Sequence, residues 1–253
     1  MKLGLVSVTF RKLNVKEIIK LAKENSIEYI EWGSSPHVEM GNVRLARKVK
    51  RLMHANNIKC ASYGSYYGVT YKKGQHRPLP FKKACKTAVA LGAKTIRIWA
   101  GWPLTGGVTQ NERDKAVLHT REIADVAKKY GLTVSFECHF DTITEDYKQS
   151  IQFIKDIDRD NVKIYWQANP FKSFEYNVEA IKALLPYTTH VHVCNWKELE
   201  KFPLADAFSD WCEYAKLLKN DDRVFMLEFM PDAEPASLPT ETQTLRDIAK
   251  EVE

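Results

Sequence analysis

The stretch that decides the fold is YGLTVSFECH, residues 130–139, in which the end of a helix is followed closely by a β-strand. Gly131 is able to take the left-handed conformation that terminates a helix. The run Thr133–His139 is rich in β-branched and aromatic residues and alternates between two kinds of face, as a strand does. A helix joined to a strand by so short a connection is typical of an α/β protein.

The same unit of strand and helix recurs eight times. Strands are expected at Gly4–Thr9, Tyr29–Gly33, Lys59–Ser65, Thr95–Gly101, Thr133–His139, Val162–Gln167, His190–Asn195 and Val224–Met230. Helices are expected at Val15–Glu24, Arg44–Asn56, Phe81–Leu91, Glu112–Tyr130, Glu145–Ile157, Asn177–Leu185, Ser209–Lys219 and Thr240–Glu251. Strands that alternate with helices predict a parallel sheet. Eight units in 253 residues predict a (β/α)₈ TIM barrel, one α/β domain over residues 1–253.

The loops that follow the strands are longer than those that follow the helices. Examples are residues 66–80, 102–111, 196–208 and 230–239. TIM barrels carry their working loops after the strands, so we expect the functional site at that end. The loop after the third strand is basic and suits a phosphate or carboxylate, although a solvated loop is the simpler interpretation. Its basic residues are Lys72, Lys73, His76 and Arg77.

The composition is that of an ordinary soluble globular protein, with 44% hydrophobic and 28% charged residues. No run approaches the roughly 20 apolar residues that span a bilayer, and the first residues lead into a strand without the organisation of a signal peptide. We therefore expect a cytoplasmic protein without a membrane partner. The five cysteines are scattered without CxxC pairs, which favours free thiols over disulfides or a structural zinc site.

The net charge of +6 comes from 38 basic and 32 acidic residues. Basic residues cluster at Arg44–Arg51 and Lys82–Lys86, at spacings that suit exposed helix faces. A solvated surface explains them. Attraction of anionic substrates or of nucleic acid is the alternative, and charge alone does not separate the two.

The alternation of side chains along a strand, here called strand parity, predicts that polar side chains of four adjacent strands point into the barrel. Successive side chains of a strand face opposite sides; most apolar ones here are assigned to the helix layer, whereas Val224 and Met226 are assigned to the interior. The inward polar set comprises Ser135, Glu137, His139, Lys163, Tyr165, Gln167, His190, His192, Cys194 and Glu228. Burial of an unpaired carboxylate costs several kcal/mol, so Glu137 and Glu228 need a cation. Lys163 or Arg97 is one source, but oxygen donors with one imidazole suit a divalent ion better.

Four short motifs resemble those of the xylose isomerase-like barrel superfamily, above all its sugar phosphate isomerase/epimerase group. They are Phe136-Glu137, Tyr165-Trp166-Gln167, His190-Val191-His192 and Leu227-Glu228-Phe229. That group also includes ketose 3-epimerases, hydroxypyruvate isomerase and inosose dehydratase. The resemblance implies four metal ligands, Glu137, Gln167, His192 and Glu228, because the family ligand is the later histidine of the His-x-His pair. Mn²⁺ is the preferred ion, with Mg²⁺, Co²⁺ and Zn²⁺ as alternatives.

Two residues depart from the family pattern. Gln167 stands where many relatives have Asp, and is interpreted as a neutral carbonyl ligand. Pro170 stands where ketose 3-epimerases have a substrate-binding His.

The resemblance implies an isomerase or epimerase that acts on a sugar or sugar phosphate. A proton next to a carbonyl would move through a metal-stabilised enediolate, with Glu137 and Glu228 as base and acid. The same constellation supports loss of water, so a dehydratase of the superfamily is an alternative. Candidate substrate-binding residues are His139, Glu31, His37, Trp99 and Trp196. Arg97 is expected deeper in the barrel, as an ion-pair partner of Glu31.

Two other functions are alternatives. An apurinic endonuclease of the superfamily uses three zinc ions and many histidines, whereas this chain has seven, and its third strand ends Ser62-Tyr63-Gly64-Ser65 without a ligand. Nucleic acid is therefore not an expected partner. A barrel that binds a sugar without turnover is the other alternative, motivated only by Gln167. The sequence leaves the oligomeric state open; a homodimer is one option, since exposed barrel ends commonly support dimers.

Overall fold

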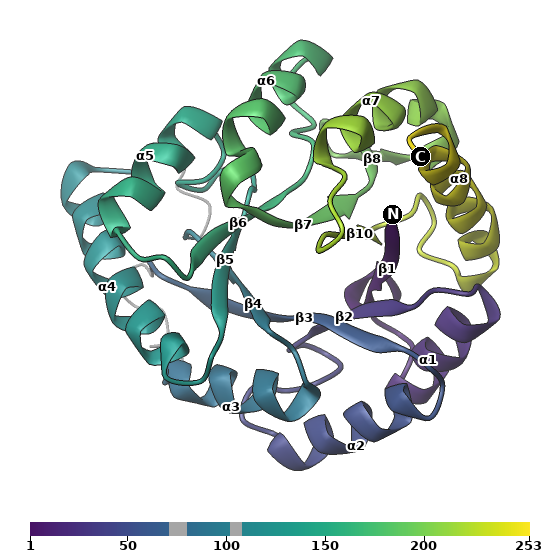
Figure 1. Cartoon of the computed structure of the whole chain (residues 1–253), viewed down its shortest axis with the longest axis horizontal. Coiled ribbons are helices and arrows are strands. Elements are labelled where there is room, and N and C mark those ends of the chain that lie inside the picture. The colour runs from purple at the N-terminus through teal and green to yellow at the C-terminus, as the bar shows by residue number, and fades with distance from the viewer. Residues whose placement is uncertain (71–79, 102–107) are drawn as a thin grey trace.

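Eight parallel strands close into a barrel, with helices around its outside (Figure 1). This computed structural model describes residues 1–70, 80–101 and 108–253. Around the barrel the strands follow the order β1 (Lys2–Val6), β10 (Val224–Leu227), β7 (Thr188–Val193), β6 (Val162–Trp166), β5 (Thr133–Glu137), β4 (Thr95–Trp99), β3 (Lys59–Gly68) and β2 (Tyr29–Gly33). The helices are α1 (Val15–Glu24), α2 (Val43–His54), α3 (Phe81–Leu91), α4 (Gln110–Lys128), α5 (Tyr147–Ile157), α6 (Phe174–Leu184), α7 (Phe208–Leu218) and α8 (Leu238–Glu251). The predicted TIM barrel is confirmed.

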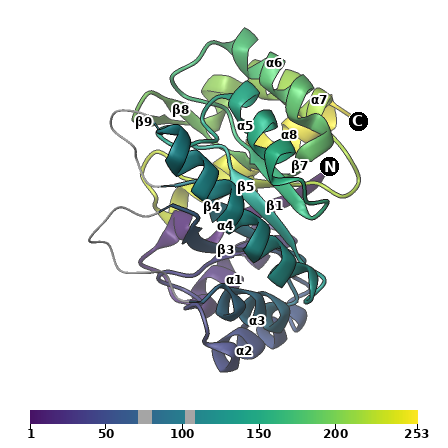
Figure 2. The same ribbon diagram turned by 90° about the vertical axis from the view of Figure 1, so that its left-hand side faces the viewer.

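Two local features differ from the expected elements. The first strand ends at Val6, because Ser7–Phe10 turns into a short 3₁₀ helix. A hairpin of β8 (Asn195–Lys197) and β9 (Glu200–Phe202) lies in the loop after β7. It was not expected, because strands of three residues are too short to show an alternating pattern. Figure 2 shows this hairpin at the end of the barrel away from the two chain termini.

The apolar side chains form two separate groups, as strand parity predicted. Residues such as Phe136, Ile164 and Val191 belong to the large core that includes the helices. A second cluster is made of Val6, Val8, Ala61, Tyr165, Val224 and Met226, all buried. A side chain at Gly4 would collide with those of Val224 and Met226, which shows how tightly this inner space is filled. The lower barrel is therefore filled by side chains rather than hollow.

Local side-chain and backbone signals mark where helices begin and end. Asn14 caps α1, since its side chain accepts from the backbone of Glu17 while the Glu17 carboxylate accepts from the Asn14 backbone. Gly92 follows α3 with φ of 85°, the left-handed conformation expected of such a glycine. None of the helices in the described ranges is long and apolar enough to cross a bilayer.

Lys72, Lys73, His76 and Arg77, which we named as a candidate phosphate or carboxylate site, lie outside the described residues.

Candidate metal centre

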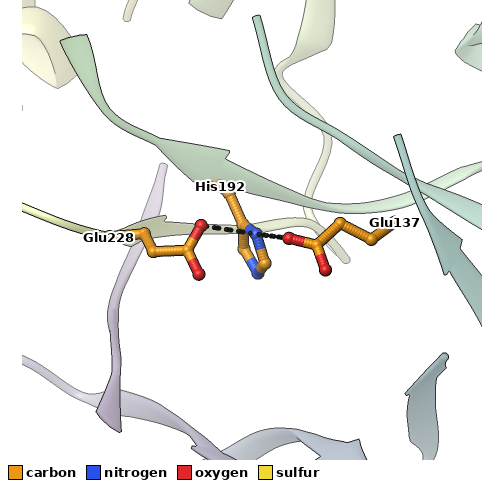
Figure 3. A group of neighbouring side chains, drawn as sticks. All are labelled: Glu137, His192 and Glu228. Atoms are coloured by element: carbon orange, nitrogen blue, oxygen red, sulfur yellow. Dashed lines mark ion pairs between the residues drawn. The ribbon is translucent and has the colours of Figure 1, made fainter. Parts of the chain in front are cut away.

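The four predicted ligands come together at the ends of four neighbouring strands. Glu137 is the last residue of β5, Gln167 follows β6, His192 lies in β7 and Glu228 follows β10. His192 Nδ1 lies 3.0 Å from Glu228 Oε2, 3.2 Å from Gln167 Oε1 and 3.4 Å from Glu137 Oε1. In Figure 3 the imidazole stands between the two carboxylates. Glu137, His192 and Glu228 are all buried, and the donor atoms of these three lie within 4.8 Å of one another.

These separations fit the donors of a single metal ion. Two ligand atoms about 2.1 Å from an ion, at a tetrahedral or octahedral angle, lie about 3.0–3.4 Å apart. The three distances measured from His192 Nδ1 fall in that range. Three oxygens and one nitrogen are a donor set that divalent ions accept. The residues present therefore fit a divalent metal.

A buried guanidinium supports one of the carboxylates from behind. Arg97 is 1% exposed, and its Nε donates to Glu31 Oε1 at 2.7 Å. Its Nη1 donates to Glu137 Oε2, so Glu137 turns its other oxygen toward His192. Ser62 Oγ donates to Glu31 Oε2 at 2.6 Å. The expected pair of Arg97 with Glu31 is confirmed.

Arg97 alone does not balance the charge of the buried carboxylates. It neutralises Glu137, as the alternative held, but within the described residues Glu228 has no arginine or lysine within 4 Å. Three buried carboxylates, those of Glu31, Glu137 and Glu228, face one guanidinium. With a neutral His192 the cluster keeps two negative charges, which one divalent ion balances.

Without an ion, His192 itself carries part of the compensating charge. Burial alone would lower the pKa of His192, but Glu228 and Glu31 raise that pKa well above its ordinary value. Burial alone would raise the pKa of Glu137 and of Glu31, but Arg97, with His192, holds both below their ordinary values. An imidazolium thus occupies the position between the carboxylates that a metal ion would share.

The earlier histidine of the pair has a different environment. His190 Nδ1 accepts a hydrogen bond from the Val224 backbone at 3.2 Å. Burial lowers the pKa of His190 to about 4, so its ring is neutral. His192, and not His190, lies against the candidate ligands.

Two residues expected to line the substrate pocket are engaged within the protein instead. Glu31 is fully buried, bound to Arg97 and Ser62, with Oε1 3.6 Å from His192 Nε2. It lies behind the ligands rather than at a pocket surface. His37 is 5% exposed, and its ring nitrogens lie 3.1 Å from Ser7 Oγ and 3.1 Å from the Leu13 carbonyl. A substrate would have to displace one of these partners.

The other three candidates are half-buried, at or just beyond strand ends. The His139 ring stacks on Trp99 with centroids 4.7 Å apart. Trp196, in β8, packs against Phe229 with centroids 5.5 Å apart. Their contact with a substrate stays a prediction.

Sequence reasoning missed two aromatic residues beside the site. Phe229 directly follows Glu228, and the Tyr66 ring lies 5.5 Å from the Arg97 guanidinium. Both have φ of 52°, a conformation unusual for residues with side chains. Such backbone is concentrated at functional sites. No feature of the sequence signals it, because aromatic residues normally avoid this region.

Comparison with known proteins gives a consistent family. The model of the family described as "Xylose isomerase-like TIM barrel" matches residues 19–249. A 3-dehydroshikimate dehydratase of Bacillus anthracis is 22% identical over 211 residues, covering 77% of this chain and 72% of that protein.

Solved structures match over nearly the whole chain. The probable 3-DHS dehydratase AsbF of Bacillus anthracis superposes with a TM-score of 0.80 at 18% identity, covering 97% of this chain and 99% of the other. A D-psicose 3-epimerase of Clostridium cellulolyticum H10 with D-tagatose gives 0.71 at 17% identity, over 100% of both chains. The IOLI protein with a binding zinc atom gives 0.72 at 17% identity, over 100% of this chain and 98% of the other.

Proposed function

Because this chain belongs to the xylose isomerase-like TIM barrel family, we propose that it is a divalent-metal-dependent enzyme that removes a proton next to a carbonyl group. The substrate is a small hydroxylated ketone. One observation carries the proposal: oxygens of Glu137, Gln167 and Glu228 converge on His192 Nδ1 at 3.0–3.4 Å. A divalent ion bound by these residues supplies positive charge for the carbonyl oxygen that becomes negative when the proton leaves. Mn²⁺ remains our preferred ion. Among similar solved structures, the IOLI protein is described with a zinc atom and a xylose isomerase-like TIM barrel protein of Mycobacterium smegmatis with magnesium.

The two glutamates have unequal roles in this proposal. Glu228 has no arginine or lysine partner among the described residues, so it is the better proton acceptor and serves as the base. Glu137 is held by Arg97, which keeps the pKa of Glu137 low and makes its protonated form unfavourable. Glu137 therefore binds the ion and stays ionised.

This asymmetry favours loss of water over epimerisation. Epimerisation returns a proton to the opposite face of the carbon, and Glu137, on the other side of His192 from Glu228 (Figure 3), is the residue in place to donate it. A carboxylate kept ionised by Arg97 is a poor donor. In dehydration, Glu228 takes the proton and returns it to a hydroxyl on the next carbon. That hydroxyl leaves as water, and a carbon–carbon double bond forms.

Two further observations agree with a dehydratase. A relative that is 22% identical is a 3-dehydroshikimate dehydratase. Pro170 stands where ketose 3-epimerases have a substrate-binding histidine. We therefore propose a cyclic hydroxylated ketone of the 3-dehydroshikimate type as the substrate.

A sugar epimerase or isomerase is the second candidate. It rests on the two glutamates that flank His192 and on the likeness to a D-psicose 3-epimerase along the full chain. The same first step, proton removal by Glu228, serves both reactions.

The test separates the two reactions in one assay. Protein stripped with a chelator is reloaded with Mn²⁺, Mg²⁺, Co²⁺ or Zn²⁺ and given 3-dehydroshikimate, D-psicose or D-tagatose in D₂O. We expect release of water from 3-dehydroshikimate, followed by ultraviolet absorbance, with at least one ion. Deuterium uptake into a ketose without any dehydration would instead favour the epimerase. No reaction with any pair of ion and substrate would contradict both.

A further inference from the structure

One cation near the candidate site, Lys201, has no acidic partner among the described residues. Lys201 lies in β9, directly across the hairpin from Trp196 in β8, and is half-buried. Its Nζ lies 5.4 Å from the centre of the Trp196 ring and 5.0 Å from that of Phe229. Phe229 directly follows the candidate ligand Glu228, and the charges of Lys201, Glu228 and Glu137 all act on the same thiol, that of Cys194.

The surroundings of Lys201 leave its charge uncompensated. In the described part of the chain no carboxylate lies within 4 Å of Nζ. Two aromatic faces replace part of its hydration, and each cation–π contact is worth only about 0.5–2 kcal/mol. The ammonium therefore keeps hydrogen-bonding capacity for an anionic acceptor.

A second donor in the same pair also lacks an acceptor. Trp196 Nε1 is buried and, among the described residues, donates to no oxygen. A buried donor without a partner costs about 1–3 kcal/mol, and this cost is recovered when a ligand supplies the acceptor. The indole N–H and the ammonium belong to one contacting pair of side chains, and a carboxylate has two acceptor oxygens.

The charge of the whole site points the same way. The three buried carboxylates and Arg97 together carry two negative charges, which a divalent ion neutralises. The positive charge of Lys201 then has no counterpart within the site. We propose that Lys201 and Trp196 receive a carboxylate of the substrate, which is then a hydroxylated keto acid rather than a neutral sugar. This inference rests on the proposed function and deepens it. A single ammonium matches one carboxylate, whereas a phosphate group carries about −1.5 to −2 at pH 7 and calls for more than one cation.

The hairpin contains its own control. Lys197 is also a lysine over an aromatic ring, with Nζ 5.4 Å from the centre of Phe202. It is exposed, and it lies one position from Trp196 along β8, so its side chain leaves the opposite face of the hairpin. Loss of charge at Lys197 should change general electrostatics but not the proposed contact.

The experiment measures binding without turnover. Shikimate, which has the carboxylate and hydroxyls but no ketone, and its neutral methyl ester are titrated calorimetrically into Mg²⁺-loaded protein. In the wild type we expect shikimate to bind roughly tenfold tighter or more than the ester, as a charge-assisted hydrogen bond warrants. Lys201→Gln should abolish that preference, Trp196→Phe should reduce it a few-fold, and Lys197→Gln should retain it.

Several outcomes would overturn the inference. They are equal binding of shikimate and its ester by the wild type, a preference that survives Lys201→Gln, a preference lost equally in Lys197→Gln, and tighter binding of D-fructose 6-phosphate than of shikimate. An unchanged melting temperature of Lys201→Gln shows that its fold is intact. Because shikimate is not turned over, this result is independent of whether the protein dehydrates or epimerises anything.

Discussion

Two arcs of the barrel carry the same kinds of polar residue but use them differently. The ligand arc, formed by β5, β6, β7 and β10, contributes Glu137, Gln167, His192 and Glu228. The support arc, formed by β2, β3 and β4, contributes Glu31, Ser62 and Arg97. Glu31 sits in the middle of its strand, whereas Glu137 ends β5 and Glu228 follows β10. Position along the strand, rather than residue type, separates a counter-ion from a candidate ligand.

The largest effect is expected from the ligand arc. Glu228→Gln keeps the shape of the side chain but removes its basicity, so kcat should fall about 10³-fold, within the range for loss of a general base. The readout is turnover of the substrate that proves active. Glu234→Gln, an exposed residue after β10, is the control and should leave kcat unchanged. Full activity of Glu228→Gln would remove it from the mechanism.

A substitution in the support arc should lower the free energy of unfolding. Arg97→Met leaves Glu31 and Glu137 buried without their cation, and loss of one partner of a buried pair costs about 3–5 kcal/mol. Urea unfolding measures this loss in the free energy of unfolding. Arg113→Met removes a partly exposed pair with Asp156 and should cost less than about 1 kcal/mol. Equal losses in the two variants would mean that the buried network is not what holds this arc together.

Metal affinity should depend on pH. In the metal-free protein the pKa of His192 is raised above its ordinary value by the neighbouring carboxylates, although burial opposes the shift. Its imidazole therefore holds a proton at neutral pH and must release it to bind an ion. Below that raised pKa, each pH unit downward should weaken apparent affinity about tenfold. Calorimetry in buffers of different ionisation enthalpy should detect about one proton released per ion; affinity independent of pH would contradict this.

The smallest effect is expected at Gln167, the neutral candidate ligand. Gln167→Glu adds a negative charge to the ligand arc at nearly constant shape and should tighten metal binding about tenfold. Gln149→Glu, on the exposed face of α5, makes the same change of net charge and should have no effect. Equal affinities of Gln167→Glu and wild type would place Gln167 outside the coordination sphere.

The sequence predicted the ligand arc better than the support arc. Strand parity and the family motifs brought forward Glu137, Gln167, His192 and Glu228, and the structure places them together. Parity also separated the inner cluster around Tyr165 from the outer core. Both succeed because a strand has a fixed two-residue period.

The sequence could not reveal how deep in the barrel a side chain lies, or where the backbone departs from regular helix and strand. The sequence places Glu31 in or just after the second strand but does not say how far below the mouth it lies, so it was expected to meet substrate. That Arg97 binds Glu31 and Glu137 together follows from the relative stagger of β2, β4 and β5, which is a three-dimensional property. The turned backbone at Phe229 and the β8–β9 hairpin break every periodic pattern.

The buried ion pair of Arg97 with Glu31 also depends on the lack of a Cβ atom at a neighbouring glycine. A Cβ built on Gly64, in β3, would lie 2.8 Å from an Arg97 nitrogen and 2.9 Å from Glu31 Oε1, too close for either. This glycine is therefore a spacer whose lack of a side chain makes room for the charges beside it. Among homologous chains the three positions should vary as a set: a lineage that gains alanine or serine here is expected to have lost the arginine, the glutamate or both.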